Sequence, residues 1–236
     1  MNKFWSWAET KETGERVLRL EGMITSDEWV AECVGGVTAR QFKAELNSGT
    51  GDITVLINSE GGDCFVAAEI YNALRDYRGR VRIVIDAVAF SAASMIAMAG
   101  DSIEISPVGM IIIHNPWTGT IGDADEFKMV ANQLDSVKEN IINAYEQKTH
   151  LPRTKLAKMM DEETFIHARK AVELGFADKI IGEENLSAET ANDSMSSRQQ
   201  IMNGIKNALR IKNKSTVPDN RVDAAQFQRR LLRKKL

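Results

Sequence analysis

Along this chain of 236 residues, segments whose hydrophobic residues recur as in a strand alternate with segments whose hydrophobic residues recur as in a helix. Arg16–Ile24 alternates apolar and polar side chains, as a strand with one buried face does, and Ile53–Ile57 is short and fully apolar. Between them, Thr38–Leu46 places apolar residues at helical spacing behind a threonine suited to cap a helix. After the glycine-containing turn at Asn58–Asp63, a second helical pattern covers Cys64–Tyr77. The first third of the chain therefore predicts strands that alternate with helices.

The central stretch predicts a serine at a strand-to-helix turn. Val81–Ala87 is typical of a buried strand, Phe90–Ala93 of a tight connection, and a helix is predicted from Ser94 onward. Ser91 lies three residues earlier, within the predicted turn. A second β-rich run ends at His114. A serine at such a turn exposes its hydroxyl beside the free N–H groups of the helix's first turn, which is an arrangement suited to acyl transfer.

The rest of the predicted core continues the alternation. The predicted segments are a loop at 117–122, a long helix at Asp123–Lys148, a shorter helix at Leu151–Met160, a small strand within Asp161–Ala168, a helix at Ala168–Phe176 and a closing strand at Ala177–Ile181. Strands that alternate with helices favour parallel pairing with right-handed crossovers. The predicted fold class is α/β.

Composition is that of a globular protein, with 43% hydrophobic and 27% charged residues. No apolar run reaches the ~18 residues that a membrane span requires, and the first residues lack the apolar core of a signal peptide. The two cysteines, Cys33 and Cys64, form neither a metal-binding spacing nor a disulfide framework. These features predict a cytoplasmic protein. Cys64, next to the glycine pair, is an alternative nucleophile, but a small buried filler is the favoured interpretation.

Charge divides the chain unevenly. Residues 186–236 carry 11 Lys+Arg and 4 Asp+Glu, whereas the first 185 residues carry 19 and 29. We therefore predict an N-terminal extension at 1–15, one α/β domain at 16–185, and a polar linker with a basic tail at 186–236, in which Ile201–Ile211 is a possible amphipathic helix. Without interleaved aromatic residues the tail gives only a weak nucleic-acid signal. Trp5 and Trp7 are expected to cover a sheet edge or a neighbouring subunit.

Several residues have functional and structural interpretations side by side. A serine at a helix start is commonly a cap, and a histidine at a strand end, such as His114, is commonly structural. His150 and His167 lie in polar contexts. The pair Gly61–Gly62 is either a simple turn or a place where a backbone N–H approaches an oxyanion. None of these features is specific when taken alone.

Together, four separated motifs resemble a known family. The segments NSEGGD, SAASM, IIIHNP and EETFIHARKAVELGFAD occur in this order within residues 16–182. They resemble the Clp protease proteolytic subunit (ClpP), and most closely its phage-encoded relatives that act in head maturation. The resemblance implies a ClpP/crotonase-like fold of repeated ββα units with a parallel sheet and a protruding handle helix, for which the long helix from Asp123 is the candidate. It makes residues 16–185 a ClpP-like serine protease domain.

The resemblance also implies roles for individual residues. Ser94, in the SAASM segment, matches the nucleophile, and His114 matches the general base that later protonates the leaving amine. The oxyanion hole corresponds to the backbone N–H groups of Gly62 and Met95. No metal or cofactor is required.

The third member of the triad and two further positions depart from the family pattern. Alignment on Phe165 and Ala168 places Glu163 where the family has an aspartate, and we prefer Glu163 to the nearby Asp161. A glutamate also orients an imidazole, although its extra methylene requires a shifted backbone. Glu60 replaces the usual proline before the paired glycines. In this alignment Phe90 and Ser91 replace a glycine and a glutamine of the cellular enzyme, in better agreement with the phage branch.

The implied function is a serine endopeptidase that processes capsid or scaffold protein in the host cytoplasm as a ring-forming homo-oligomer. The N-terminal residues do not resemble the segment that meets the unfolding ATPase, so that partner is not expected. Three rival functions remain open: a crotonase-type acyl-CoA enzyme, a serine/lysine hydrolase, and a non-catalytic component of capsid assembly. No lysine lies between Lys43 and Lys128, so a lysine base for the serine has to come from a distant segment.

Overall fold

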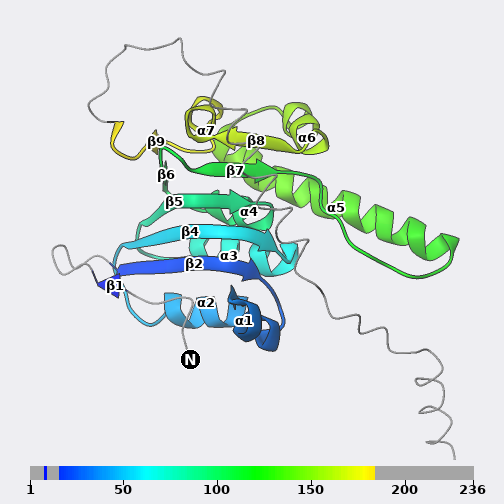
Figure 1. Cartoon of the computed structure of the whole chain (residues 1–236), viewed down its shortest axis with the longest axis horizontal. Coiled ribbons are helices and arrows are strands. Elements are labelled where there is room, and N and C mark those ends of the chain that lie inside the picture. Colours follow the sequence, from blue (N-terminus) through cyan, green and yellow to red (C-terminus); the bar gives the residue numbers. More distant parts are fainter. Residues whose placement is uncertain (1–7, 10–15, 184–236) are drawn as a thin grey trace, which may run out of the picture. The chain divides into compact units, whose positions relative to one another are not determined.

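The computed structural model describes residues 8–9 and 16–183, which form a mixed α/β domain around one sheet (Figure 1). The predicted roles of Trp5 and Trp7, the linker, the helix at 201–211 and the basic tail all fall on residues outside these ranges. Within the described ranges no helix is long and apolar enough to cross a membrane.

The strands are β1 (Ala8–Glu9), β2 (Arg16–Ile24), β3 (Gly36–Val37), β4 (Ile53–Gly62), β5 (Val81–Phe90), β6 (Ser102–Ile105), β7 (Met110–Ile113), β8 (Thr164–His167) and β9 (Lys179–Ile180). The helices are α1 (Glu28–Val34), α2 (Ala39–Leu46), α3 (Cys64–Arg75), α4 (Ala92–Ala97), α5 (Ala124–Thr149), α6 (Arg153–Asp161) and α7 (Ala168–Leu174). All the helices and strands predicted between residues 16 and 181 are present in this order, whereas α1, β1 and β3 were not predicted.

The sheet order is β1-β2-β4-β5-β6-β9, and β5 divides it into two branches. The first half of β5 pairs with β6, while its last three residues pair with β7, which in turn pairs with β8. All pairings are parallel except β1 with β2 and β7 with β8. This arrangement confirms the predicted α/β class with a parallel sheet and is consistent with the ClpP fold.

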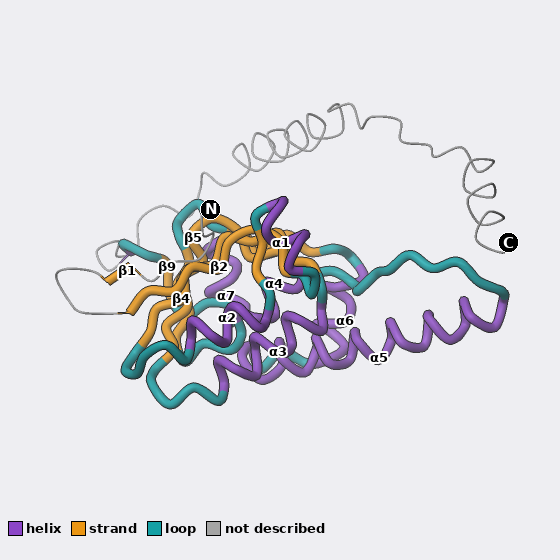
Figure 2. Tube along the Cα trace, turned by 90° about the horizontal axis from the view of Figure 1, so that it is seen from below, coloured by secondary structure: helices purple, strands orange, loops and turns teal. Residues whose placement is uncertain are grey.

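Local sequence explains the core elements. Thr38 caps α2 and forms a reciprocal capping box with Gln41, so the predicted helix begins where the threonine indicated. The buried side of α2 presents Phe42 and Leu46 to the sheet. In Figure 2, α2 and α3 lie on the same side of the sheet. The central strands contribute the fully buried residues of the core, namely Leu18, Leu20, Val55, Ile57, Ile83 and Ile85.

The serine turn differs from the prediction. Strand β5 continues past Ala87 to Phe90, because its last residues pair with β7. Helix α4 begins at Ala92 rather than at Ser94. The residue between the strand and the helix is therefore Ser91, and Ser94 lies inside the helix.

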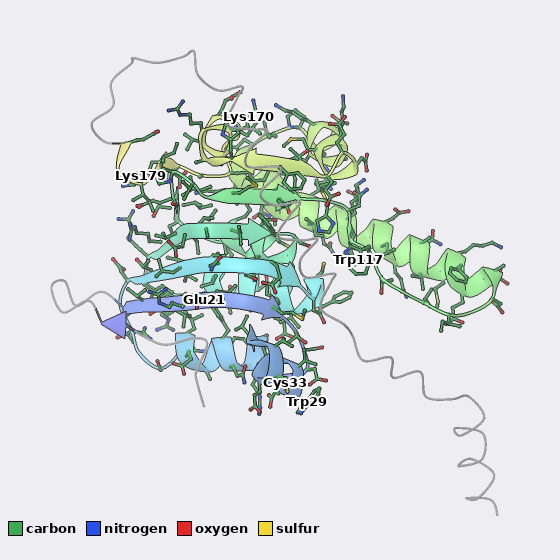
Figure 3. All side chains as sticks on the ribbon, viewed as in Figure 1. Glu21, Trp29, Cys33, Trp117, Lys170 and Lys179 are labelled. Atoms are coloured by element: carbon green, nitrogen blue, oxygen red, sulfur yellow. The ribbon has the colours of Figure 1, made fainter. Side chains whose placement is uncertain are left out.

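The structure differs from the predicted elements at two other places. The β-rich run before His114 consists of two strands, β6 and β7, separated by a turn in which the Gly109 N–H donates to the Ser106 carbonyl. Helix α1 was missed, although Asp27 accepts hydrogen bonds from the amides of Trp29 and Val30, as a capping aspartate does. Figure 3 shows Trp29 and Cys33 on this helix, where both side chains are exposed.

The long helix α5 has two different halves. Asp123 caps its first turn, and its second half is buried through Ile141, Ile142, Ala144 and Tyr145. The first half is exposed, and Figures 1 and 2 both show the segment before α5 running out to a tip at which the helix begins. The first half of α5 therefore projects from the rest of the domain.

Candidate active site

The register of three strands brings the serine turn, His114 and Glu163 to one end of the sheet. The last residue of β5 pairs with the third residue of β7, and the last residue of β7 pairs with the first residue of β8. The residue after β5 is Ser91, the residue after β7 is His114, and the residue before β8 is Glu163. The Ser91 N–H donates to the Ile112 carbonyl across this junction at 2.9 Å. A serine, a histidine and a carboxylate therefore occupy neighbouring strand ends.

Ser91 has the backbone of a residue held under strain. Its φ of 52° and ψ of −124° lie in a region that residues with a Cβ rarely adopt. Its side chain is partly exposed and makes no capping hydrogen bond to α4. Strained residues of this kind cluster at active sites, and a nucleophile on a sharp strand-to-helix turn is one recurrent form.

Ser94 lies in a different environment. Its side chain is fully buried, and its hydroxyl is 2.5 Å from the Ser91 carbonyl oxygen and 2.7 Å from the Tyr145 hydroxyl. The Ser94 hydroxyl is thus enclosed and hydrogen-bonded to two partners in this structure, and it has to turn away from them to meet a peptide carbonyl. Ser94 stays the predicted nucleophile.

His114 is the histidine nearest to this serine turn. It is half-buried, and its Nδ1 lies 2.7 Å from the carbonyl oxygen of Asn115. The other two histidines act at helix ends: His150 follows α5 in the left-handed conformation, and His167 caps α7. Within residues 16–183, no hydrogen bond directly joins the side chains of the predicted triad, Ser94, His114 and Glu163, in this structure.

The two carboxylates near His114 differ in their partners. Asp161 accepts hydrogen bonds from Lys138 at 2.6 Å and from the Asn115 side chain at 2.9 Å, and these bonds lower the pKa of Asp161. Glu163 is exposed and makes no ion pair within the part of the chain that the structure describes. This difference favours Glu163, because Asp161 is already occupied in joining α5, α6 and the segment after β7.

A lysine also approaches this end of the sheet. Lys138, on α5, is the lysine that binds Asp161. This ion pair holds the ammonium group of Lys138 at the Asp161 carboxylate rather than at a serine hydroxyl. The structure therefore does not favour the serine/lysine hydrolase.

The glycine pair lies directly against the serine turn. Gly61 and Gly62 have φ values of 89° and 145°, which favour glycine. A Cβ added to Gly61 would lie 2.5 Å from the Phe90 carbonyl oxygen and 2.9 Å from both the Ala92 nitrogen and the Ser91 Cβ. Only a residue without a side chain allows this contact between β4 and the turn.

The predicted oxyanion donors lie on the two segments that meet at this turn. Gly62 ends β4, the strand that contacts the turn, and Met95 directly follows Ser94 in α4. The N–H groups of Gly62 and Met95 stay the predicted donors.

Cys64 does not share these properties. Burial, together with the neighbouring Asp63 carboxylate, raises the pKa of the Cys64 thiol. The reactive form of a cysteine is the thiolate, which this environment disfavours. Within the described residues no group of three His, Cys, Asp or Glu side chains is placed to hold a metal ion.

Comparison with known proteins adds an independent observation. The sequence model of a protein family described as "Clp protease" matches residues 8–184. The chain is 24% identical over 163 residues to the ATP-dependent Clp protease proteolytic subunit of Deinococcus radiodurans, covering 67% of this chain and 80% of that protein. It is 27% identical over 172 residues to the protein of the same name from Borreliella afzelii, covering 72% and 85%. The corresponding protein of Pleurastrum terricola is 30% identical over 132 residues, covering 55% and 67%.

Proposed function

The chain belongs to the Clp protease family, and on that premise we propose that it is a serine endopeptidase with Ser94 as its nucleophile. The observation that carries the proposal is the position of Ser94 in the first turn of α4, directly after the strained turn at Ser91 that ends β5. The strand register supports His114 and Glu163 as its partners.

The proposed reaction proceeds through an acyl-enzyme. His114 takes the proton of the Ser94 hydroxyl as the oxygen attacks the peptide carbonyl, and then donates that proton to the leaving amine. Water, deprotonated by the same imidazole, releases the acyl group. Glu163 orients the imidazole and stabilises its charged form. These side chains have to approach one another for catalysis, and triad hydrogen bonds commonly tighten only when substrate is bound.

The two amides act on the charge that develops in the transition state. In this proposal the Gly62 and Met95 N–H groups donate to the oxyanion, a contribution of about 3 kcal/mol for one such donor. An extended peptide would reach Ser94 along the end of β4, where the glycine pair leaves the backbone accessible. No cofactor takes part in these steps.

The biological substrate is a second, more specific part of the proposal. Glu60 in place of the family's proline, and N-terminal residues unlike the segment that meets an ATPase, support the phage branch, in which capsid or scaffold protein is cleaved during head maturation. We propose that the chain acts as a ring-forming homo-oligomer through the projecting half of α5. The curated relatives are described as ATP-dependent, so the prediction that no ATPase takes part is a distinguishing feature of this proposal.

Covalent labelling tests the nucleophile. A fluorophosphonate is expected to add one phosphonyl group to the wild-type chain, and peptide mass mapping is expected to locate it on Ser94. Ser94→Ala is expected to abolish labelling, whereas Ser91→Ala is expected to retain it. A label on Ser91 would contradict the assignment, and an unlabelled wild type would favour the non-catalytic or acyl-CoA alternatives.

A further inference from the structure

The hydroxyl of the proposed nucleophile, Ser94, is held by two groups in this structure. Its oxygen lies 2.5 Å from the Ser91 carbonyl oxygen and 2.7 Å from the Tyr145 hydroxyl. A carbonyl oxygen only accepts hydrogen bonds and a serine hydroxyl carries one hydrogen, so the Ser94 hydrogen points to Ser91. The Tyr145 hydroxyl must then donate to the Ser94 oxygen. Both the hydrogen and a lone pair of the nucleophile are therefore engaged by the protein itself.

His114, by contrast, already has the form that a general base requires. Its Nδ1 lies 2.7 Å from the Asn115 carbonyl oxygen. Because that oxygen only accepts, Nδ1 carries the hydrogen of the neutral imidazole, and Nε2 is left to accept a proton. Among residues 16–183, no hydrogen bond joins Ser94 to His114. A turn of the Ser94 hydroxyl towards the imidazole therefore separates this structure from an active one.

The two partners of Ser94 are affected differently when its hydroxyl turns. The Ser91 carbonyl keeps a second donor, the Ser94 backbone N–H at 2.9 Å. Tyr145 is 1% exposed, and in the part of the chain that the structure describes its hydroxyl has Ser94 as its one hydrogen-bond partner. A buried hydroxyl that loses its partner is unfavourable. The turned state is therefore disfavoured chiefly through Tyr145.

Tyr145 is fixed in place and does not follow the serine. Its ring packs edge-on against the buried Phe176, with the ring centres 5.5 Å apart. Its backbone carbonyl accepts a hydrogen bond from Thr149 in the last turn of α5. Burial raises the pKa of the Tyr145 phenol, so the hydroxyl keeps its hydrogen and remains a donor at neutral pH. Tyr145 is therefore a stationary donor from which the serine has to move away.

We propose that Tyr145 restrains the nucleophile: its hydroxyl holds Ser94 in a resting position away from His114, and this hydrogen bond has to break before Ser94 attacks a substrate. The inference rests on the proposed function, because it takes Ser94 as the nucleophile. It assigns to the buried half of α5 a restraint on the reaction rather than a contribution to it.

The kinetics of fluorophosphonate labelling test this restraint through Tyr145→Phe. The second-order labelling rate constant kinact/KI is measured for the wild-type chain and for the variant. Phenylalanine keeps the ring but has no hydroxyl that loses its partner when Ser94 turns. We expect the rate constant to rise about 5- to 50-fold, because the turned state is no longer disfavoured. A phenol that assists the reaction would give the opposite sign.

Thr149→Val is the matched control. Thr149 carries another buried hydroxyl of the same helix, which donates to the Tyr145 carbonyl at 2.7 Å rather than to the nucleophile. Its removal is expected to lower the thermal unfolding midpoint and to leave the labelling rate constant within about twofold. An equal rise in Thr149→Val and Tyr145→Phe would show that a loosened α5, and not the loss of the phenol, speeds the reaction, and would overturn the restraint.

A double-mutant cycle measures the same hydrogen bond without any reaction. Ser94→Ala leaves the Tyr145 hydroxyl buried without a partner, so its thermal unfolding midpoint is expected to fall by about 3–8 °C. In the double variant Ser94→Ala/Tyr145→Phe neither hydroxyl remains, so the midpoint is expected to recover by about half of that loss or more. Losses that simply add would show that the two hydroxyls do not interact, and would overturn the restraint.

The outcomes distinguish the two proposals. Labelling of Ser94 with an unchanged or lower rate constant in Tyr145→Phe would overturn the restraint alone. Wild-type and Tyr145→Phe chains that both stay unlabelled, or that are both labelled on Ser91, would overturn the proposed function and this inference with it.

Discussion

Glu163 stands at an unusual backbone position for a catalytic carboxylate. Its φ of 46° places it in the left-handed region, between the end of α6 and the start of β8. This kink shifts the chain just where a glutamate replaces the family's aspartate. A displaced backbone is what the additional methylene requires if the carboxylate is to reach the imidazole of His114.

We predict that Glu163→Gln lowers the rate of fluorophosphonate labelling of Ser94 by about 100-fold or more, because a neutral amide does not stabilise the imidazolium. Glu163→Asp keeps the charge on a shorter side chain, and a loss of about tenfold in the labelling rate is expected. Asp161→Asn is the matched control and should retain the rate within about threefold. A larger effect of Asp161→Asn than of Glu163→Gln would show that Asp161 completes the triad.

Gly61 supports a second prediction at the residue scale. In Gly61→Ala the new Cβ would collide with the Phe90 carbonyl oxygen at 2.5 Å, in addition to the strain of a positive φ. We expect a loss of about 3 kcal/mol or more in the free energy of unfolding, together with loss of labelling at Ser94, which follows this turn. Gly51→Ala is the control, because Gly51 has a φ of 95° but no atom within 4 Å of the added Cβ.

Urea denaturation of both glycine variants provides the comparison. Gly51→Ala should lose only about 1–2 kcal/mol, the cost of the backbone conformation itself, and should keep its labelling rate. Equal losses in the two variants would mean that the turn moves away from Gly61 at little cost. The close contact would then not define the site.

The sequence alone located the serine turn but misplaced the start of the helix that follows it. The helix begins at Ala92, so Ser91 lies at the junction and Ser94, the predicted nucleophile, lies in the first turn of α4. The apolar run that continues through Phe90 was the available signal, because it extends the strand and leaves Ser91 at the junction. Hydrophobic periodicity does not reveal that Phe90 pairs with Ile112, and this pairing determines where the strand ends. The partners of Ser94, in particular Tyr145, come from a distant helix and could not be predicted.

At the scale of elements, prediction succeeded where the sequence carries local signals. Thr38 and Asp123 mark helix starts through their side-chain hydrogen bonds to the first turns of α2 and α5. Gly175 marks the end of α7 in the left-handed conformation. Short elements such as β3 depend on pairing with a neighbour, and two residues carry no periodicity of their own. The division of β5 between two partners, β6 and β7, also depends on long-range pairing.

An ion pair that joins three strands provides the next prediction. Glu104, on β6, is 6% exposed and accepts two hydrogen bonds from Arg82 on β5, at 2.8 and 2.6 Å. Lys179, on β9, lies 3.3 Å from the same carboxylate. The hydrogen bonds from Arg82 hold the pKa of Glu104 below its usual value. This stabilisation is complete above the pKa of the unfolded chain and is lost as the pH falls through the lower pKa of the folded chain.

We expect Glu104→Gln to lower the free energy of unfolding by about 1.5–3 kcal/mol at pH 7, because charge-assisted hydrogen bonds are lost. The difference from the wild-type chain should shrink as the carboxylate is protonated below about pH 4. Urea denaturation at several pH values measures both effects. Glu173→Gln is the control, because Glu173 is exposed and pairs with Lys170 at the surface. A pH-independent difference for Glu104→Gln would contradict the electrostatic explanation.

Several large apolar side chains are exposed to solvent on the projecting part of the domain. Trp117 and Ile121, in the segment before α5, are 80% and 98% exposed, and Phe127 and Met129 of α5 are also exposed. Figure 3 shows Trp117 on the segment that leads to the projecting tip. Exposed apolar groups gathered on one projection are typical of an interaction site. The proposed homo-oligomer provides an occupant, namely the same projection of a second copy.

The oligomer is the subject of the last prediction. Native mass spectrometry of the wild-type chain should give a multiple of its 26.2 kDa mass. The double variant Phe127→Asp/Met129→Asp places charges on the projecting helix and should shift the population to a smaller multiple, because burying them unpaired in an interface is unfavourable. Gln133→Glu adds a charge at an exposed site of the same helix and should leave the mass unchanged if that site lies outside the interface. A wild-type chain of 26.2 kDa under all conditions would contradict assembly, and a double variant that keeps the wild-type mass would place the contact on another surface.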